Sequence, residues 1–322
     1  MDREKALEDY QERIAPLIQK FHHQMGTYLR EHAEELEQTV KGAIDELGEK
    51  MASQGKEYVS YLYISMLKTD VLCRNYRFLL HAMNLKWYLD EETIEVYFDA
   101  GNLMGPFDEL WDRLEQENYG YMGAVNQYDI QHIMFGQLRE VDSAIAHILR
   151  YRLRDWKKKE LFSKVTLPNF WLLKWGEYRD RTEIILYTDQ EVKEQRVWKS
   201  QLKEAIFKPE TMVFSYWYQG DYEDCLITQM DMRFMVMEEC VLKDFKFLDC
   251  NLEGARFTGA SLTGCIFEGC NLSGVDFSGC TFKDVSFAGS EMADALLMAD
   301  SVPFLNLSPE QLQAILLRRE NG

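Results

Sequence analysis

The chain has 322 residues, of which 46% are hydrophobic and 28% charged, a composition typical of globular domains rather than of disordered chains. Acidic residues outnumber basic ones by 54 to 36, which disfavours a general nucleic-acid binder because phosphate contacts need local positive charge. No apolar run reaches the roughly 18 residues that span a bilayer, and the opening MDREKALEDY lacks the pattern of a secretion signal, so we expect a cytoplasmic protein.

The first 165 residues predict an α-helical domain. Apolar residues recur at steps of three and four from Leu7 to Tyr28 and again from Leu36 to Met51. This spacing indicates one stripe of a long helix or a helix pair, with Gly26 as a candidate kink. The stripe fits either a bundle within one chain or a coiled-coil dimer, and we favour the bundle because it is commoner.

The segment from Tyr58 to Leu89 is nearly apolar all round. Such a run predicts a central helix of the bundle, with Cys73 as a core residue rather than a nucleophile. Further helices are expected after Asp90, over Phe107 to Glu117, and from about Gln127 to Lys164, with Asn118 or Asn126 as a cap or break.

Residues 166–222 have a mixed pattern and are interpreted as a connecting and capping segment. Thr182 to Thr188 resembles a strand, Phe170 to Tyr178 its partner, and Glu191 to Phe207 a helix. An aromatic set in this region could stack bases, but we favour a seam between two domains. Its members are Trp171, Trp175, Trp198, Tyr216, Trp217 and Tyr218.

A dense positive stretch precedes this segment. It contains Arg150, Arg152, Arg154 and the run Lys157 to Lys159. We interpret residues 150–159 as the solvated end of a helix, where cations suit the helix dipole. The alternative is a docking patch for an acidic partner or nucleic acid.

From Cys225 onward the sequence repeats every five residues. The middle place of each five is large and apolar in fifteen consecutive repeats, from Ile227 to Leu297. The first place is small in most repeats, and the last is Gly or Asp from Asp244 to Asp294. A period of five fits neither a straight strand nor a helix, so the chain must turn at every repeat and stack on itself.

The cysteines follow the same period. All except Cys73 occupy positions divisible by five. Neither a disulfide framework nor a zinc site has a reason to keep that spacing, whereas a small apolar slot in a repeat does. We therefore expect reduced thiols that serve packing, in preference to redox sensors. The other thiols are Cys225, Cys240, Cys250, Cys265, Cys270 and Cys280.

These residues resemble the pentapeptide-repeat family, as in CNLEG (250–254), ASLTG (260–264) and CNLSG (270–274). The resemblance implies a right-handed quadrilateral β-helix with four repeats per coil, covering about a quarter of the chain. Fifteen repeats then give just under four coils, a rod roughly 18 Å long at the spacing of neighbouring strands. The resemblance carries no information about the N-terminal region.

The open ends of such a rod need covering. Ser308 to Gln311 has the pattern of a capping box, and the helix through Leu312, Ile315 and Leu316 could lie on the last coil. At the other end, residues 167–222 or the helical domain would serve.

The expected architecture is therefore an α+β multidomain protein. Its parts are an α-helical domain (1–165), a connecting and capping segment (166–222), a repeat β-helix (223–302) and a C-terminal capping helix (303–322).

No residue of the sequence is identified as catalytic, cofactor-binding or metal-binding. The chain has no nucleotide-binding Gly-rich loop, no HExxH and no GxSxG. Asp129 and His132 share a helix face at a spacing found in metal bundles, but the second pair such sites need is missing. We expect no cofactor and no enzyme activity.

Three functions remain open. The leading one is a non-catalytic scaffold that binds an unidentified protein, or a second copy, on the outward polar surface of the rod. The residues expected there include Glu253, Thr258, Glu268, Ser273 and Asp276. The second is mimicry of DNA toward a topoisomerase such as DNA gyrase, which the family resemblance suggests. The net negative charge of the repeats has the same sign as that of DNA. The third is an enzyme or ligand site in the N-terminal domain. Neither a membrane nor a nucleic acid is expected as a partner.

Overall fold

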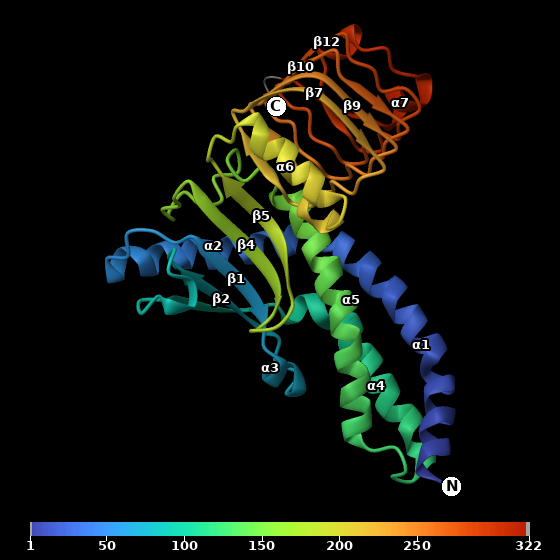
Figure 1. Cartoon of the computed structure of the whole chain (residues 1–322). Coiled ribbons are helices and arrows are strands. Elements are labelled where there is room, and N and C mark those ends of the chain that lie inside the picture. The colour runs from blue at the N-terminus through green and yellow to red at the C-terminus, as the bar shows by residue number, and fades with distance from the viewer. Residues whose placement is uncertain (1, 320–322) are drawn as a thin grey trace. The chain divides into compact units, whose positions relative to one another are not determined.

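The computed structural model describes residues 2–319. The chain divides after Leu186 into two compact units, each with its own hydrophobic core. The predicted order, N-terminal helices followed by a stacked β-coil, is confirmed, and Figure 1 follows it from the blue helices to the red rungs. Within residues 2–319, none of the helices combines the length and apolarity that crossing a membrane requires.

Long helices carry the two predicted apolar stripes of the first unit. Helix α1 (Arg3–Glu31) packs against α4 (Gly105–Asn118) and α5 (Gln127–Leu153), so its stripe is buried within one chain, as the bundle interpretation requires. Helix α2 (Ala33–Gln54) follows directly. The break between α1 and α2 lies at His32, whose backbone N–H donates to the Tyr28 carbonyl, rather than at Gly26.

A five-stranded mixed sheet completes this unit, in the order β3-β2-β1-β4-β5. Strand β1 pairs antiparallel with β2 and parallel with β4, and β2 pairs antiparallel with β3. Helices α2 and α5 pack on the sheet, and alternate residues such as Leu62 and Ile64 join the core with them. The strands are β1 (Tyr61–Met66), β2 (Arg77–Met83), β3 (Ile94–Asp99), β4 (Phe170–Glu177) and β5 (Thr182–Asp189).

The helix predicted over Tyr58 to Leu89 is wrong. This segment forms β1, the short helix α3 (Lys68–Leu72), β2 and the 3₁₀ turn η1 (Trp87–Leu89). An apolar run without a period suits a buried strand as well as a buried helix, and aromatic and β-branched residues favour the strand. Cys73 ends α3 and is exposed, so its assignment to the core is also wrong.

Two further helix predictions need correction. The helix expected after Asp90 is strand β3, in which Ile94 and Val96 are buried while Glu95 and Tyr97 are exposed. The helix expected to reach Lys164 ends at Leu153. Its start is as predicted, because Asn126 caps it and forms a capping box with Asp129. Short 3₁₀ turns η2 (Gly101–Met104) and η3 (Tyr119–Tyr121) flank α4.

The second unit is a coil of parallel rungs. Asp221 pairs with Val241, Val241 with Ser261, and Ser261 with Thr281, so each turn takes 20 residues, or four repeats. Residues 216–318 make about five turns. The strands are β6 (Tyr216–Tyr218), β7 (Asp221–Thr228), β8 (Val236–Glu238), β9 (Val241–Leu248), β10 (Ser261–Thr263), β11 (Ile266–Glu268), β12 (Thr281–Lys283), β13 (Leu296–Met298) and β14 (Leu316–Arg318).

The corner of every repeat is left-handed. Positive φ values recur at each fifth residue from Phe214 to Asp294, which explains the predicted preference for Gly and Asp at that place. The coil begins earlier than residue 223, because Trp217 and Tyr222 already occupy central places. The repeat pattern does not reveal these rungs, since their corners are Phe214 and Gln219 instead of Gly or Asp.

The interior of the coil is filled as predicted. Phe267 stacks between Phe247, at a ring-centroid distance of 4.9 Å, and Phe287, at 5.3 Å. All three side chains are buried. Because equivalent residues lie one turn apart, the central side chains form continuous ladders through the coil.

Helix α6 (Gln195–Ala205) covers the N-terminal end of the coil. Its Trp198 is fully buried against Trp217, at a centroid distance of 4.8 Å, and donates from Nε1 to Cys225 Sγ at 3.3 Å. A 3₁₀ turn, η4 (Pro209–Thr211), follows the helix. The predicted helix over 191–207 and its capping role agree with this arrangement.

The C-terminal cap is a helix and a strand rather than one helix over 303–322. After η5 (Val302–Phe304), Ser308 forms the predicted capping box of α7 (Pro309–Ala314), and β14 then pairs with β13. Ile315 is buried, but Leu312 and Leu316 are exposed, contrary to the prediction, because the chain leaves the helix before a full apolar face forms. The part of this prediction at residues 320–322 lies outside the described residues.

Candidate interaction surface

The longest strands of the coil, β7 and β9, run across a corner and so occupy two of its sides. They pair in register from Asp221–Val241 to Thr228–Leu248. The next turn adds β10 and β11 to these sides, and β12 follows β10. We call the outward side chains of these strands the β7–β9 surface. Its exposed members are Asp221, Glu223, Leu226, Thr228, Lys243, Lys246, Glu268, Thr281 and Lys283.

An acidic column marks the corner between the two sides. Asp224, Asp244 and Asp284 are exposed and stand at equivalent corners one or two turns apart, with φ between 52° and 55°. Gly264 occupies the place between the last two, where a Cβ would lie 2.4 Å from Asp244 Oδ1. The column lies between sides that also carry exposed lysines, so the β7–β9 surface has mixed charge.

A third side of the coil is polar and locally hydrogen-bonded. Asn251 and Asn271 accept from the backbone N–H two residues onward, at 3.2 and 3.0 Å. The predicted outward residues Glu253 and Ser273 lie on this side and are half-buried. Their main chain is therefore fixed by Asx turns, and their side chains offer less contact area than the β7–β9 surface.

The fourth side contradicts one prediction. Asp276, expected to face solvent, is only 2% exposed, and its carboxylate accepts from the Ser278 backbone N–H at 2.8 Å. Arg318 of the last rung also donates to Ser278 Oγ. Thr258, on the same side, is half-buried, whereas Glu268 of the β7–β9 surface is exposed as predicted.

The periodic cysteines serve the coil's packing. The thiols of Cys240, Cys265 and Cys270 each donate to a carbonyl 23 residues earlier, at 3.3–3.5 Å. Ser290 Oγ makes the equivalent bond to Phe267 at 3.1 Å. Burial raises the pKa of the Cys240 thiol to about 12, so this thiol stays protonated and unreactive at neutral pH.

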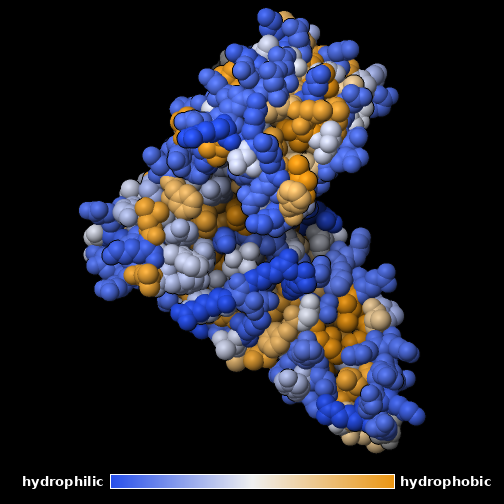
Figure 2. Space-filling view, in the orientation of Figure 1, coloured by the Kyte–Doolittle hydropathy of each residue, from blue (hydrophilic) through white to orange (hydrophobic). Residues whose placement is uncertain are grey.

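Asp129 and His132 have different surroundings in the structure. Asp129 is bound to Arg3 at 2.9 Å and to the helix N-terminus. His132 lines an apolar groove of about 550 Å³ between α1 and α5, and Figure 2 shows apolar side chains along these helices. Across residues 2–319, no three His, Cys, Asp or Glu side chains are grouped as a metal site would require.

Several cationic side chains of residues 150–159 form ion pairs within the first unit. Arg150 pairs with Glu183 at 2.8 Å and donates to the Ile184 carbonyl. Arg152 and Lys159 both pair with the buried Glu37. These contacts agree with a helix end fixed by local ion pairs.

The aromatic set predicted to form a seam is divided between two cores. Trp171 and Trp175 are buried in the core of the first unit, whereas Trp198 and Trp217 are buried in that of the second. Tyr216 is also buried and donates to Glu238. The tryptophans therefore serve core packing and are not available to stack bases.

Comparison with known proteins supports the interpretation of the coil. A family model described as pentapeptide repeats matches residues 237–274 and 250–289, in eight copies. No curated protein matches the chain.

Solved structures similar to part of the chain include two that are described as pentapeptide repeat proteins. A pentapeptide repeat protein, Rfr23, from the cyanobacterium Cyanothece 51142 is 25% identical over 24% of this chain and 52% of its own, with a TM-score of 0.23. A pentapeptide repeat protein from the Arabidopsis thaliana thylakoid lumen is 19% identical over 31% and 70%, with a TM-score of 0.16. QnrB1, a plasmid-mediated fluoroquinolone resistance protein, is 17% identical over 27% and 50%, also with a TM-score of 0.16. This chain thus spans about half the length of Rfr23 and of QnrB1.

Proposed function

Because residues 237–289 are pentapeptide repeats wound into a stacked coil, we propose that the chain is a non-catalytic interaction protein that binds a protein partner on its β7–β9 surface. The observation that carries this proposal is the outward row of exposed side chains on β7 and β9, two paired eight-residue strands. Such a row offers a partner charged, polar and apolar contacts on one continuous sheet.

The rigidity of the coil favours this role. Each rung is hydrogen-bonded to the next, and the stacked phenyl rings leave little freedom inside. A surface that is already ordered loses little conformational entropy on binding, so more of its contact energy becomes affinity.

The composition of the surface favours a partner that is itself polar. Lys243, Lys246 and Lys283 are exposed beside the acidic column, so attraction requires a partner with both signs of charge. Leu226, 65% exposed, adds an apolar contact near one end.

The same lysines distinguish this function from mimicry of DNA. A DNA mimic presents a largely uniform negative surface, whereas the β7–β9 surface carries three exposed lysines, on β9 and β12, among its acids. A gyrase supercoiling assay in the presence and absence of a quinolone separates the two functions. We expect no effect of the intact protein, even in excess over gyrase.

The proposal is tested by charge reversal on two sides of the coil. Intact chains carrying Lys243→Glu with Lys246→Glu are compared with chains carrying Arg233→Glu with Glu291→Lys, which lie on the third side. Each is used as bait in native lysate from the source cells, after circular dichroism has shown an unchanged melting temperature.

We expect the first variant to lose partners that the unaltered chain and the second variant both retain. Equal capture by all three would overturn the proposed surface. Loss by the second variant alone would move the binding site to the third side of the coil.

A further inference from the structure

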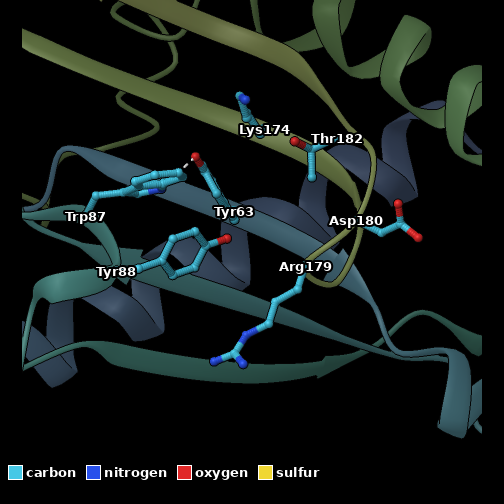
Figure 3. Close-up of a pocket in the computed structure, with 7 residues that line it drawn as sticks. All are labelled: Tyr63, Trp87, Tyr88, Lys174, Arg179, Asp180 and Thr182. Atoms are coloured by element: carbon cyan, nitrogen blue, oxygen red, sulfur yellow. Dashed lines mark hydrogen bonds between the residues drawn. The ribbon is translucent and has the colours of Figure 1, made fainter.

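The first unit has a pocket of about 620 Å³ on the sheet (Figure 3). Its volume lies within the range of small-molecule binding sites. The walls come from β1 and the η1 turn, and, far along the sequence, from β4, the start of β5 and the turn between these two strands. The lining residues are Tyr63, Trp87, Tyr88, Lys174, Arg179, Asp180 and Thr182.

Strand register places the floor of the pocket on the sheet face opposite the core. Tyr63 pairs with His81 on one side and with Lys174 on the other. The residues before them in sequence, Leu62, Leu80 and Leu173, belong to the hydrophobic core. Because side chains alternate along a strand, Tyr63, His81 and Lys174 point to the opposite face of the sheet. The Lys174 ammonium lies 5.5 Å from the centre of the Tyr63 ring.

An aromatic wall rises from the η1 turn. Trp87 and Tyr88 have ring centroids 4.5 Å apart, yet they are 46% and 43% exposed. Trp87 Nε1 donates to Tyr63 Oη at 3.0 Å, which fixes the indole and leaves the Tyr63 proton free to donate elsewhere. A large exposed ring held in one orientation, as the Trp87 indole is, provides a surface on which a flat ligand can stack.

The turn that carries this wall is strained and firmly held. Trp87 has a φ of 56°, a left-handed conformation that is costly for a bulky residue. Asp90 holds the turn by accepting from the Asn84 and Glu92 backbone N–H groups and pairing with Lys56. Strain that the surrounding structure maintains in this way is frequent at binding sites.

The polar groups of the pocket are mainly donors. Lys174 is half-buried, and among residues 2–319 its ammonium group has no ion-pair or hydrogen-bond partner. Arg179 projects from the turn between β4 and β5, and its guanidinium lies 5.2 Å from the centre of the Tyr178 ring. Figure 3 shows it on the opposite side of Tyr88 from Lys174. The lining holds a single carboxylate, that of Asp180, which lies 3.5 Å from Lys68.

We propose that this pocket binds a small planar aromatic anion, with its ring stacked on Trp87 beside Tyr88 and its anionic group near Lys174. The hydroxyls of Tyr63 and Thr182 supply further hydrogen bonds. A half-buried ammonium without a counter-charge is unfavourable, and an anionic ligand would remove that cost. Burial lowers the pKa of Lys174, in agreement with a cation that lacks a carboxylate neighbour.

The anionic group can be a phosphate or a carboxylate, and separate probes distinguish them. The intact chain is titrated with adenosine monophosphate and with indole-3-acetate, using calorimetry and quenching of tryptophan fluorescence. Adenosine and inorganic phosphate, the two parts of adenosine monophosphate, are titrated separately as controls. We expect at least one intact anion to bind with a Kd below about 1 mM, and both parts to bind at least about tenfold more weakly.

Variants assign the binding to this pocket. Lys174→Met and Trp87→Leu should each weaken binding by about tenfold or more, whereas Lys174→Arg should retain most of it. The matched controls are Lys20→Met and Tyr119→Leu, exposed positions of the same unit, which should bind normally.

Binding of neither anion at millimolar concentration would overturn the proposal. Equal affinities of Lys174→Met, Trp87→Leu and the unaltered chain would overturn it as well. If Lys174→Met does not fold, Lys174→Arg and Trp87→Leu still test it. The Lys243→Glu variants should bind the anion normally, so this experiment is independent of the partner-binding surface.

Discussion

Lys56 and Asp90 form an ion pair that is almost completely withdrawn from water. The distance from Lys56 Nζ to Asp90 Oδ2 is 2.7 Å, and the two side chains are 5% and 2% exposed. Lys56 lies just after α2, and Asp90 ends the η1 turn that carries Trp87 and Tyr88. The pair therefore fixes the aromatic wall of the pocket to the end of a core helix.

Replacing Lys56 by methionine should leave a buried carboxylate without its cation. We expect a loss of about 3–5 kcal/mol in the free energy of unfolding, measured by urea denaturation at pH 7. Lys50→Met removes the exposed pair with Glu46 and should cost less than about 1 kcal/mol. Equal small losses for the two variants would contradict a structural role for the buried pair.

The Lys56–Asp90 pair should also make the free energy of unfolding depend on pH. Burial alone would raise the pKa of Asp90, but Lys56 and two backbone N–H groups hold it below its ordinary value of 3.8. A carboxyl with a depressed native pKa stabilises the fold above that ordinary value, and the stabilisation is lost as the pH falls through the native pKa. Between pH 6 and pH 3, Lys56→Met should therefore lose less stability than the unaltered chain does.

Asp142 should give the opposite pH dependence. It is buried in α5, accepts from Trp175 Nε1 at 3.0 Å, and burial raises its pKa to about 7. Because the native state then binds more protons than the unfolded state, stability should fall as the pH rises from about 4 to 7. Asp142→Asn keeps an acceptor for Trp175 and should stabilise the protein at pH 8 by on the order of 2–4 kcal/mol, with little effect at pH 4.

Denaturation of Asp142→Asn and of the unaltered chain at pH 4, 6 and 8 measures this difference. Parallel stability curves would show that the carboxyl does not titrate in this range.

The stacked ring ladder should account for much of the coil's stability. Phe267→Ala removes the ring between Phe247 and Phe287 and should cost about 3–5 kcal/mol, whereas Phe267→Leu should cost about 1–1.5 kcal/mol. Phe304→Ala, at a residue 81% exposed, should change stability by less than about 0.5 kcal/mol. Chemical unfolding monitored by circular dichroism checks the order, and a result in which Phe267→Ala resembles Phe304→Ala would refute the packed ladder.

The coil could be predicted because its rule is local. Each repeat specifies its own central residue and its own corner, so a period read from Ile227 to Leu297 is enough to identify it. The predicted start of the coil was too late, because the earlier corner at Gln219 carries neither Gly nor Asp. The prediction also failed at Asp276, which is buried although its place in the repeat faces outward.

The sheet and its pocket depend on contacts that are distant in the sequence. Lys174 reaches Tyr63 only because β4 joins β1 in parallel, after more than 100 intervening residues. No period marks such a pairing, and the apolar run that contains β1 and β2 is equally compatible with a buried helix. A local signal for strands is nevertheless present between Tyr58 and Leu89. There, Tyr, Phe and Ile are concentrated in short runs separated by polar residues such as Asn75, which is typical of strands.

The C-terminal end of the coil should depend on one buried amide. Gln311 Nε2 donates to the Phe287 carbonyl at 2.8 Å and to the Ser290 carbonyl at 2.9 Å, which ties α7 to the preceding turn. Gln311→Ala leaves both acceptors without this donor and should cost about 1–3 kcal/mol. Gln313→Ala, at an exposed position of the same helix, should have little effect on thermal or urea unfolding.

Truncation after Leu305 extends the same argument. It removes α7 and β14, so β13 loses its partner strand, the Phe287 carbonyl loses its donor, and the core of the coil loses the buried Ile315. Uncovered strand edges and apolar surface favour association, and we expect a lower melting temperature together with oligomers in size-exclusion chromatography. A truncated chain that remains monomeric and melts at the original temperature would show that the coil closes without its cap.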